Sequence, residues 1–269
     1  MKPKILITGA SGLIGGIVLK TLCRKYDFTT VNRRKVESFP TTQADIADLE
    51  AILPAFKGID SVLHLASHTA GNNWDKQMSV DIGGTYNVYE AARRNGIKRV
   101  VYASSGGTML GYEGDQPYFD IVAAQYDKVP DKWQMVTHEW PQRPNDLFYV
   151  AKVCGEVIGR YFSDQYGISS INIRLGAVLA DDKPTLRRHY PGYLSQADCV
   201  QMIDKCLSAP ESVQYDIFDA ISDNRWRWRD ISHANDVLGW QPEGSAENYE
   251  IEDQGGPHQV NKTFALRED

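Results

Sequence analysis

The sequence predicts an α/β domain built on a doubly wound parallel sheet. Short, continuously apolar runs recur along the chain and are typical of strands buried on both faces; they cover residues 5–7, 28–31, 61–66, 99–104, 170–175 and 215–219. Segments with helical apolar spacing lie between them, over 13–25, 48–56, 76–95, 146–166 and 196–208. A glycine-rich turn joins the first run to the first helical segment. Alternating strands and helices predict a sheet covered by helices on both sides.

The first turn predicts a phosphate-binding loop of the Rossmann type. Gly9, Gly12 and Gly15 stand three residues apart, directly after the first apolar run. Glycine permits the tight turn, the close approach of backbone to a pyrophosphate and the packing of helix on strand. The following helix presents free N–H groups and a partial positive charge to the phosphates. We therefore expect this segment to bind a dinucleotide through the residues Gly9, Ser11, Gly12, Leu13, Ile14 and Gly15.

The predicted strands place their carboxyl ends around one crevice, where ligands of doubly wound sheets bind. The residues expected there are Thr8, Asn32, Ala66, Ser105 and Gly176. We interpret residues 1–269 as a single domain with a dinucleotide-binding core (1–175), a small C-terminal cap on the substrate side (176–250) and a tail (251–269). Residues 112–145, with four prolines and many aromatic residues, are expected to form an irregular lid or binding loop. Trp226 and Trp228 suggest an edge strand or a lid over the core, with packing rather than base stacking as their role.

Composition excludes several classes of protein. The 269 residues are 42% hydrophobic and carry a net charge of −6, which argues against a nucleic-acid partner. No apolar run is long enough for a membrane span, and the first strand leaves no room for a signal peptide. Four scattered cysteines suggest reduced thiols in a cytoplasmic protein. His64 and His68 have no further ligands at suitable spacing, so we predict no metal site and expect His64 to be a packed strand residue.

Several motifs resemble the extended short-chain dehydrogenases of the NAD-dependent epimerase/dehydratase superfamily. These are Thr8-Gly9-x-x-Gly12-x-x-Gly15, Asp45-Ile46, His64-Leu65-Ala66, Ser104-Ser105-Gly106-Gly107-Thr108, the helix around Lys152, and Arg174-Leu175-Gly176. The resemblance covers nearly the whole chain. It implies further cofactor contacts from Asp45, Ile46, Leu65, Ala66, Ser67, Lys152 and Ala177. It also implies a homodimer through helices 76–95 and 146–166, although these faces could equally be covered within one chain.

Within that superfamily the chain is most similar to uronate dehydrogenases, which oxidise the anomeric carbon of a uronate to an aldarolactone. The similarity lies in Leu238-Gly239-Trp240-Gln241-Pro242 with Ser245-Ala246-Glu247, and in Leu194-Ser195 with Asp198. It implies that Thr69 contacts the substrate and that Arg188 pairs with the substrate carboxylate through its planar guanidinium. Alternatively, Arg188 is a solvated member of the charged run 183–189.

The residues after the second strand favour NADP over NAD. An acidic residue here would bond the ribose hydroxyls of NAD, but the chain has Asn32, Arg33 and Arg34. A guanidinium suits the 2′-phosphate of NADP. In the alternative, Arg33 and Arg34 are ordinary surface charges and Asn32 bonds the ribose of NAD.

The family's catalytic pattern is incomplete here. That pattern has a Ser or Thr, a Tyr, and a Lys four residues after the Tyr, which lowers the pKa of the phenol. Four residues before Lys152 stands Phe148, and the neighbouring Tyr149 is rotated about 100° around the helix. Ser105 or Thr108 could supply the hydroxyl.

Three interpretations follow from the missing tyrosine. In the first, an oxidoreductase for a sugar or uronate-like substrate takes its acid–base group from elsewhere, with Tyr149, Tyr118, Tyr126 and His138 as candidates. In the second, an epimerase- or dehydratase-like enzyme of the same fold does not need that tyrosine. In the third, the chain is a cofactor-binding sensor or scaffold without turnover.

Overall fold

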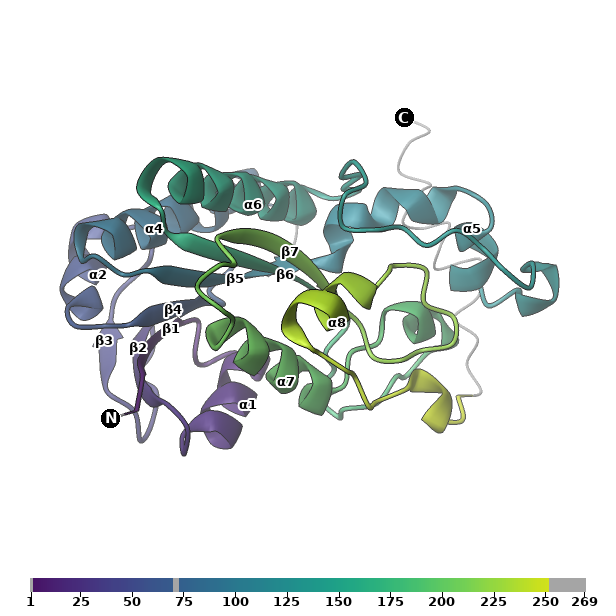
Figure 1. The fold of residues 1–269 in the computed structure, drawn as a ribbon, viewed down its shortest axis with the longest axis horizontal. Coiled ribbons are helices and arrows are strands. Elements are labelled where there is room, and N and C mark those ends of the chain that lie inside the picture. The colour runs from purple at the N-terminus through teal and green to yellow at the C-terminus, as the bar shows by residue number, and fades with distance from the viewer. Residues whose placement is uncertain (1, 70–72, 252–269) are drawn as a thin grey trace.

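The computed structural model describes residues 2–69 and 73–251 and confirms the predicted fold class. Seven parallel strands form one sheet in the order β3-β2-β1-β4-β5-β6-β7 (Figure 1). Their bounds are β1 Lys4–Thr8, β2 Asp27–Asn32, β3 Thr41–Gln43, β4 Ser61–His64, β5 Arg99–Ser105, β6 Ser169–Leu175 and β7 Tyr215–Ala220. The order reverses between β1 and β4, so the loops that leave these two strands diverge to opposite faces and open a crevice between them.

Helices cover both faces of the sheet. One face carries α1 (Leu13–Leu22), α7 (Gln196–Leu207) and α8 (Ser232–Leu238), and the other carries α2 (Leu49–Ile52), α4 (Gly84–Arg94) and α6 (Leu147–Tyr166) (Figure 1). The remaining helical segments are η1 (Leu53–Phe56), α3 (Trp74–Lys76), η2 (Gln77–Gly83), η3 (Gly106–Gly114), α5 (Tyr118–Val122), η4 (Tyr126–Lys128), η5 (Arg187–Gly192) and η6 (Ala246–Asn248). Of these, η2 is a π-helix.

The strand pattern separates two apolar cores. In β1, Ile5 and Ile7 point into the core beneath α1 and α7, whereas Leu6 points into the core beneath α2 and α4. Successive side chains of a strand alternate between faces, so a continuous apolar run is what a sheet covered on both sides requires. Each such side chain, when fully buried, contributes about 1.5–3 kcal/mol to the free energy of folding.

The segment 112–145 is more ordered than the sequence suggests. Its α5 and the preceding η3 form a third apolar cluster around Met109, Tyr118, Ile121 and Trp228. This cluster lies at the strand-end side of the molecule, to the right in Figure 1. Of the two alternatives for Trp226 and Trp228, the edge strand is wrong and the packing role is confirmed. Within the described residues, only a single bridge between Val136 and Arg229 forms nearby, and the indoles pack among aromatic side chains.

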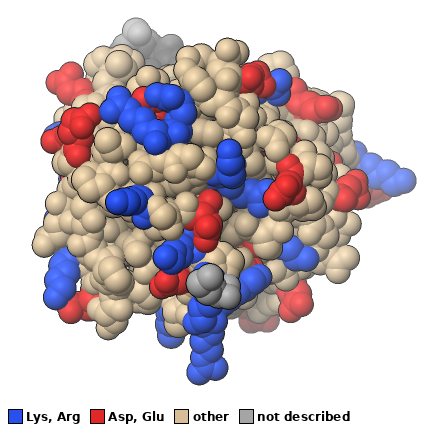
Figure 2. All heavy atoms as spheres, turned by 60° about the vertical axis from the view of Figure 1, so that its left-hand side comes forward, with Lys and Arg blue, Asp and Glu red and all other residues tan. Residues whose placement is uncertain are grey.

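The surface carries charges of both signs. On the face shown in Figure 2, basic and acidic side chains are interspersed rather than gathered by sign. Within residues 2–69 and 73–251, no helix combines the length and the apolar character that crossing a bilayer requires.

Candidate active site

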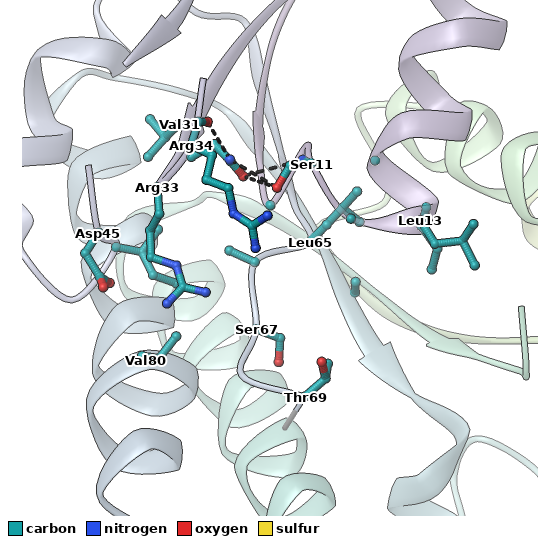
Figure 3. A pocket seen from close by; sticks show the side chains of 18 of the residues that line it. Ser11, Leu13, Val31, Arg33, Arg34, Asp45, Leu65, Ser67, Thr69 and Val80 are labelled. Atoms are coloured by element: carbon teal, nitrogen blue, oxygen red, sulfur yellow. Dashed lines mark hydrogen bonds between the residues drawn. The ribbon is translucent and has the colours of Figure 1, made fainter. Parts of the chain in front are cut away.

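A cavity of about 680 Å³ opens where the strand order reverses (Figure 3). It is lined by every residue predicted to contact the cofactor apart from Lys152 and Ala177, and also by Thr69. The sequence reasoning missed the apolar part of the wall, because ordinary core side chains carry no distinctive signal. That part consists of Val31, Ala44, Val80, Ala103 and Val178.

The glycines of the first loop have little room for side chains. Gly9 has φ +74°, and a Cβ on it would lie 2.6 Å from the backbone nitrogen of Ala66. A Cβ on Gly15 would lie 2.6 Å from the Cα of Ala10. Gly12 is the N-cap of α1, and no side chain caps the helix there. The N–H groups at the start of α1 are thus available to an anion in the cavity, as a pyrophosphate requires.

Two arginines directly after β2 line this cavity. The Asn32 amide is engaged, since its Nδ2 donates to the Arg34 carbonyl (2.7 Å) and to Ser11 Oγ (3.1 Å). The exposed side chains of Arg33 and Arg34 extend into the same part of the cavity (Figure 3). Neither forms an ion pair with any residue in 2–69 or 73–251. Two unpaired guanidinium groups therefore face the space where the adenosine end of a dinucleotide would lie.

Lys152 is buried next to this cavity. Its Nζ donates to the Ala103 carbonyl (2.8 Å) and lies 5.4 Å from the centre of the Phe148 ring. Burial lowers the pKa of Lys152 to about 8, against the opposing effect of Asp81. The Asp81 carboxylate comes from the π-helix η2 and accepts the Ser67 hydroxyl. The lysine is thus held by a carbonyl and a nearby carboxylate, and the phenyl ring of Phe148 stands where the family pattern has a phenol.

His64 is fully buried and is a packed strand residue, as predicted. Its Nδ1 lies 2.7 Å from Thr8 Oγ1, and its Nε2 lies 3.0 Å from Thr85 Oγ1. The Thr85 hydroxyl donates to the Asp81 carbonyl, so Nε2 carries the ring proton and Nδ1 accepts from Thr8. Burial, with a smaller effect from Lys152, lowers the pKa of His64 to about 3.

A second, smaller cavity of about 320 Å³ adjoins the first. On β5, Ala103 lines the first cavity and Ser105, two residues further along, lines the second. After β6, Ala177 lines the second cavity and its neighbour Val178 lines the first. A nicotinamide that reached past Ala103 and Val178 would therefore face the second cavity. Its lining residues are Ser105, Gly106, Gly107, Leu110, Glu113, Tyr149, Leu175, Gly176, Ala177, Arg188, His189, Gly192, Trp228 and Arg229.

Tyr149 lines this second cavity together with Ser105, although its helical position suggested that it points elsewhere. The room for this side chain comes from Gly107 at the start of η3, and the preceding Gly106 leaves room for Arg229 in the same way. A Cβ on Gly107 would lie 2.0 Å from Cε1 of Tyr149, and a Cβ on Gly106 would lie 2.1 Å from Nη1 of Arg229. Without side chains, the two glycines leave space for the phenol and the guanidinium. Burial raises the pKa of Tyr149, and the positive charges of Arg188 and Arg229 oppose this rise.

The other candidate acid–base groups lie outside the second cavity. The Tyr118 hydroxyl donates to the Gln134 carbonyl (2.8 Å), and the Tyr126 ring stacks on Trp226 with centroids 4.0 Å apart. The His138 ring stacks on His233. Of the four candidates, only Tyr149 lines a cavity beside the predicted cofactor site.

The two hydroxyl candidates differ in placement. Ser105 lines the second cavity, and its Oγ accepts the Gly107 N–H (3.0 Å). Thr108 is fully buried and donates its hydroxyl to the Ser105 carbonyl (2.9 Å). Thr69, predicted to contact the substrate, lines the first cavity instead of the second.

The two arginines that line the second cavity each pair with a carboxylate. Arg188, expected to meet a substrate carboxylate, lies 2.5 Å from the carboxylate of Glu113. Arg229 lies 2.5 Å from the carboxylate of Asp219. Burial raises the pKa of Glu113, against the opposing effects of Arg188, Arg229 and the Trp228 hydrogen bond. Sequence reasoning missed Glu113, Asp219 and Arg229, since only the fold brings these residues to one place.

One group of potential metal ligands escaped the sequence analysis. Ligand atoms of His138, Asp216 and His233 all lie within 4.8 Å of one another. The two imidazoles stack with centroids 3.9 Å apart and planes 12° apart, and His233 Nε2 lies 2.7 Å from the Asp216 carboxylate. The lone pairs of nearly parallel rings lie in separate planes and do not converge on one point. In this arrangement the three residues are a hydrogen-bonded stack that joins β7, α8 and the segment before α6.

Comparisons with known proteins agree with this geometry. An L-arabinose 1-dehydrogenase (NAD(P)(+)) from Haloferax volcanii is 30% identical over 249 residues, covering 89% of this chain and 96% of that protein. A uronate dehydrogenase from Pseudomonas putida is 28% identical over 262 residues, covering 94% and 90%. A mutant uronate dehydrogenase from Agrobacterium tumefaciens, solved in complex with NAD, superposes with a TM-score of 0.79 at 25% identity over 98% of this chain and 90% of that one.

The match to a family as a whole is equally extensive. The profile of the NAD dependent epimerase/dehydratase family matches residues 5–238, from β1 to the end of α8. This range includes the glycine loop at the point where the strand order reverses, and the serine at the end of β5. This chain is a member of the NAD dependent epimerase/dehydratase family.

Proposed function

We propose that the protein is an NAD(P)-dependent dehydrogenase that oxidises the anomeric hydroxyl of a free sugar, with a relocated catalytic tyrosine. The observation that carries this proposal is the meeting of Tyr149 and Ser105 in a small cavity that adjoins the dinucleotide cavity. The relatives with sugar 1-dehydrogenase or uronate dehydrogenase activity support the same reaction class. A cavity of about 320 Å³ is at the lower end of the range for small-molecule sites, which suits a monosaccharide.

The reaction removes a hydride from the anomeric carbon and a proton from its hydroxyl. Bound NAD(P) supplies the hydride acceptor. Tyr149, as the phenolate, takes the hydroxyl proton. Burial and the carboxylates of Asp146 and Glu113 raise the pKa of this phenol, and the nearby Arg188 and Arg229 oppose that rise. Ser105 hydrogen-bonds the same hydroxyl and orients it. Lys152, whose ammonium group is buried and donates to the carbonyl of the cavity residue Ala103, would hold the cofactor and has no phenol at position 148 to activate.

The substrate assay tests the reaction. The protein is incubated with NAD or NADP and a panel of free aldoses and uronates, and the absorbance of the reduced cofactor is followed. Tyr149→Phe is expected to lower kcat by at least about 100-fold while leaving cofactor affinity unchanged, because general acid–base catalysis contributes about 10²–10⁴-fold. Tyr118→Phe, which changes a hydroxyl bound to the Gln134 carbonyl, is the matched control and should keep most of the activity. If Tyr149→Phe kept its kcat and Tyr118→Phe lost it, the role of Tyr149 would be refuted.

We infer that the cofactor is NADP. The guanidinium groups of Arg33 and Arg34, which have no ion-pair partner among the described residues, support this, since each charge-assisted hydrogen bond to a 2′-phosphate contributes about 1.5–3 kcal/mol. Arg34→Ala should weaken NADPH binding by about 10- to 100-fold and leave NADH binding nearly unchanged. Lys35→Ala, an exposed neighbour, is the control. Tighter binding of NADH than of NADPH by the unaltered protein would show that NAD is the cofactor.

A cofactor-binding protein without turnover is the second candidate. Phe148 at the family's tyrosine position favours it, and so does burial, which raises the pKa of Tyr149. This candidate predicts normal binding of NADPH with no reduction of NADP by any sugar in the panel.

We also propose that two copies of the chain associate through α4 and α6. Four large side chains on these helices are exposed by 46–61%: Tyr86, Val157, Tyr161 and Tyr166. The occupant we assign to this face is the same face of a second copy, since an isologous contact pairs each apolar patch with itself. Light scattering should give a dimer for the unaltered protein and a monomer for Val157→Glu.

A further inference from the structure

We propose that the sugar oxidised by this protein is a neutral aldose rather than a uronate. The inference rests on the proposed function and specifies its substrate class. It follows from the charges of the second cavity, which are already balanced within the chain.

Two arginines line the cavity, and each has a buried carboxylate as partner. The Glu113 side chain is 3% exposed and lies 2.5 Å from Arg188, whose own side chain is 21% exposed. The Asp219 side chain is 1% exposed and lies 2.5 Å from Arg229, which is 5% exposed. Burial and the neighbouring Arg188 lower the pKa of His189, so this third basic residue of the wall is neutral near pH 7. The two guanidinium charges are therefore offset by Glu113 in the wall and by Asp219, which pairs with Arg229 behind the wall.

A uronate would introduce a carboxylate into this balanced site. To be bound by Arg188 in the usual forked geometry, it would have to displace Glu113 or share the guanidinium with it. Displacement would leave a carboxylate that is almost fully buried without its partner, which is costly in a medium of low polarity. Sharing would bring two carboxylates to one guanidinium, and like charges at such distances repel each other. Either route disfavours an anionic sugar.

A neutral aldose meets neither obstacle. Its hydroxyl groups can donate to the Glu113 carboxylate and accept from the N–H groups of Arg188 that the ion pair does not use. The carboxylate of Glu113 is 3% exposed, pairs with Arg188 and lines the cavity together with Trp228. A carboxylate oxygen is an acceptor suited to a hydroxyl and not to another anion.

The decisive measurement compares kcat/KM of the unaltered protein for neutral aldoses, such as L-arabinose and D-galactose, with that for D-galacturonate. We expect the better neutral sugar to be preferred by at least about tenfold. A preference for galacturonate would overturn the inference and leave the proposed dehydrogenase function intact. Absence of turnover with every sugar would overturn both.

A substitution then tests the cause. Glu113→Gln keeps the size of the side chain and removes its charge, which frees Arg188. We expect kcat/KM for galacturonate relative to the neutral sugar to rise by at least about tenfold. Asp115→Asn, which removes the partner of exposed Arg143 outside the cavity, is the control and should leave the ratio unchanged. An unchanged ratio in a folded Glu113→Gln protein would contradict the role given to this carboxylate. The comparison on the unaltered protein needs no variant and tests the inference even if Glu113→Gln fails to fold.

Discussion

Gly107 offers a direct test of whether the tyrosine has been relocated. A Cβ at this position would lie 2.0 Å from the Tyr149 ring, whereas ordinary contact begins at 3.4 Å. In Gly107→Ala the ring must therefore retreat by about 1.4 Å, the difference between these distances. A displacement of about 1 Å in a catalytic group can reduce the rate by about 100-fold. We expect kcat to fall by about that factor or more, together with a loss of about 1–3 kcal/mol in the free energy of unfolding from overpacking.

The assay separates displacement of the phenol from general damage. NADPH affinity should be unchanged, because Gly107 lines only the second cavity among the two that adjoin β5. Gly16→Ala is the matched control: its Cβ meets no atom within 4 Å, and alanine within a helix stabilises by about 0.5–1 kcal/mol. The double variant Gly107→Ala/Tyr149→Phe should have the same kcat as the slower of the two single variants, since both substitutions remove the same function. A Gly107→Ala protein with normal kcat would refute the reasoning.

Three further predictions concern the framework of the site. Gly9→Ala should abolish measurable binding of NADPH, because the residue combines φ +74° with a backbone contact of 2.6 Å; calorimetry would check this. His64 has its pKa lowered to about 3 from 6.5, so the unfolded chain binds the extra proton below pH 6.5 and stability is lost as the pH falls. Between pH 7.5 and pH 5 this amounts to about 2 kcal/mol, and urea unfolding of His64→Gln should show a pH dependence smaller by that amount. Glu156→Gln leaves the fully buried Arg174 without its partner and should cost about 3–5 kcal/mol, roughly 10 °C in Tm; Asp164→Asn, in an exposed pair, should cost less than about 1 kcal/mol.

The sheet and the cofactor loop were predictable because their signals are local. Continuous apolar runs such as 99–104 are typical of buried parallel strands, and the spacing of Gly9, Gly12 and Gly15 reflects steric needs within one turn. By contrast, β3 has three residues and no apolar run, so nothing in its sequence distinguishes it from a loop. The helix expected over 76–95 was only partly right, since its first part is the π-helix η2. The hydrogen-bond pattern of a π-helix could not be predicted from the spacing of apolar residues.

The substrate side of the site was less accessible to sequence reasoning. Tyr149 reaches its cavity because Gly107, which is distant in sequence, leaves room for the ring, and helical spacing alone cannot show this. Arg188 was recognised as a candidate, but its pairing with Glu113 joins residues 75 positions apart. Contacts of this kind depend on how η3 and η5 meet in space, which a single sequence does not specify.

The division of the arginines between solvent and interior has a consequence for the response to salt. Arg33 and Arg34 are exposed, so their attraction for a phosphate is screened as ionic strength rises, with a Debye length near 8 Å in physiological salt. The pairs of Arg188 and Arg229 are largely shielded from water and are much less affected. If the proposed function is right, added sodium chloride should therefore weaken the binding of the dinucleotide while KM for an uncharged sugar stays nearly constant.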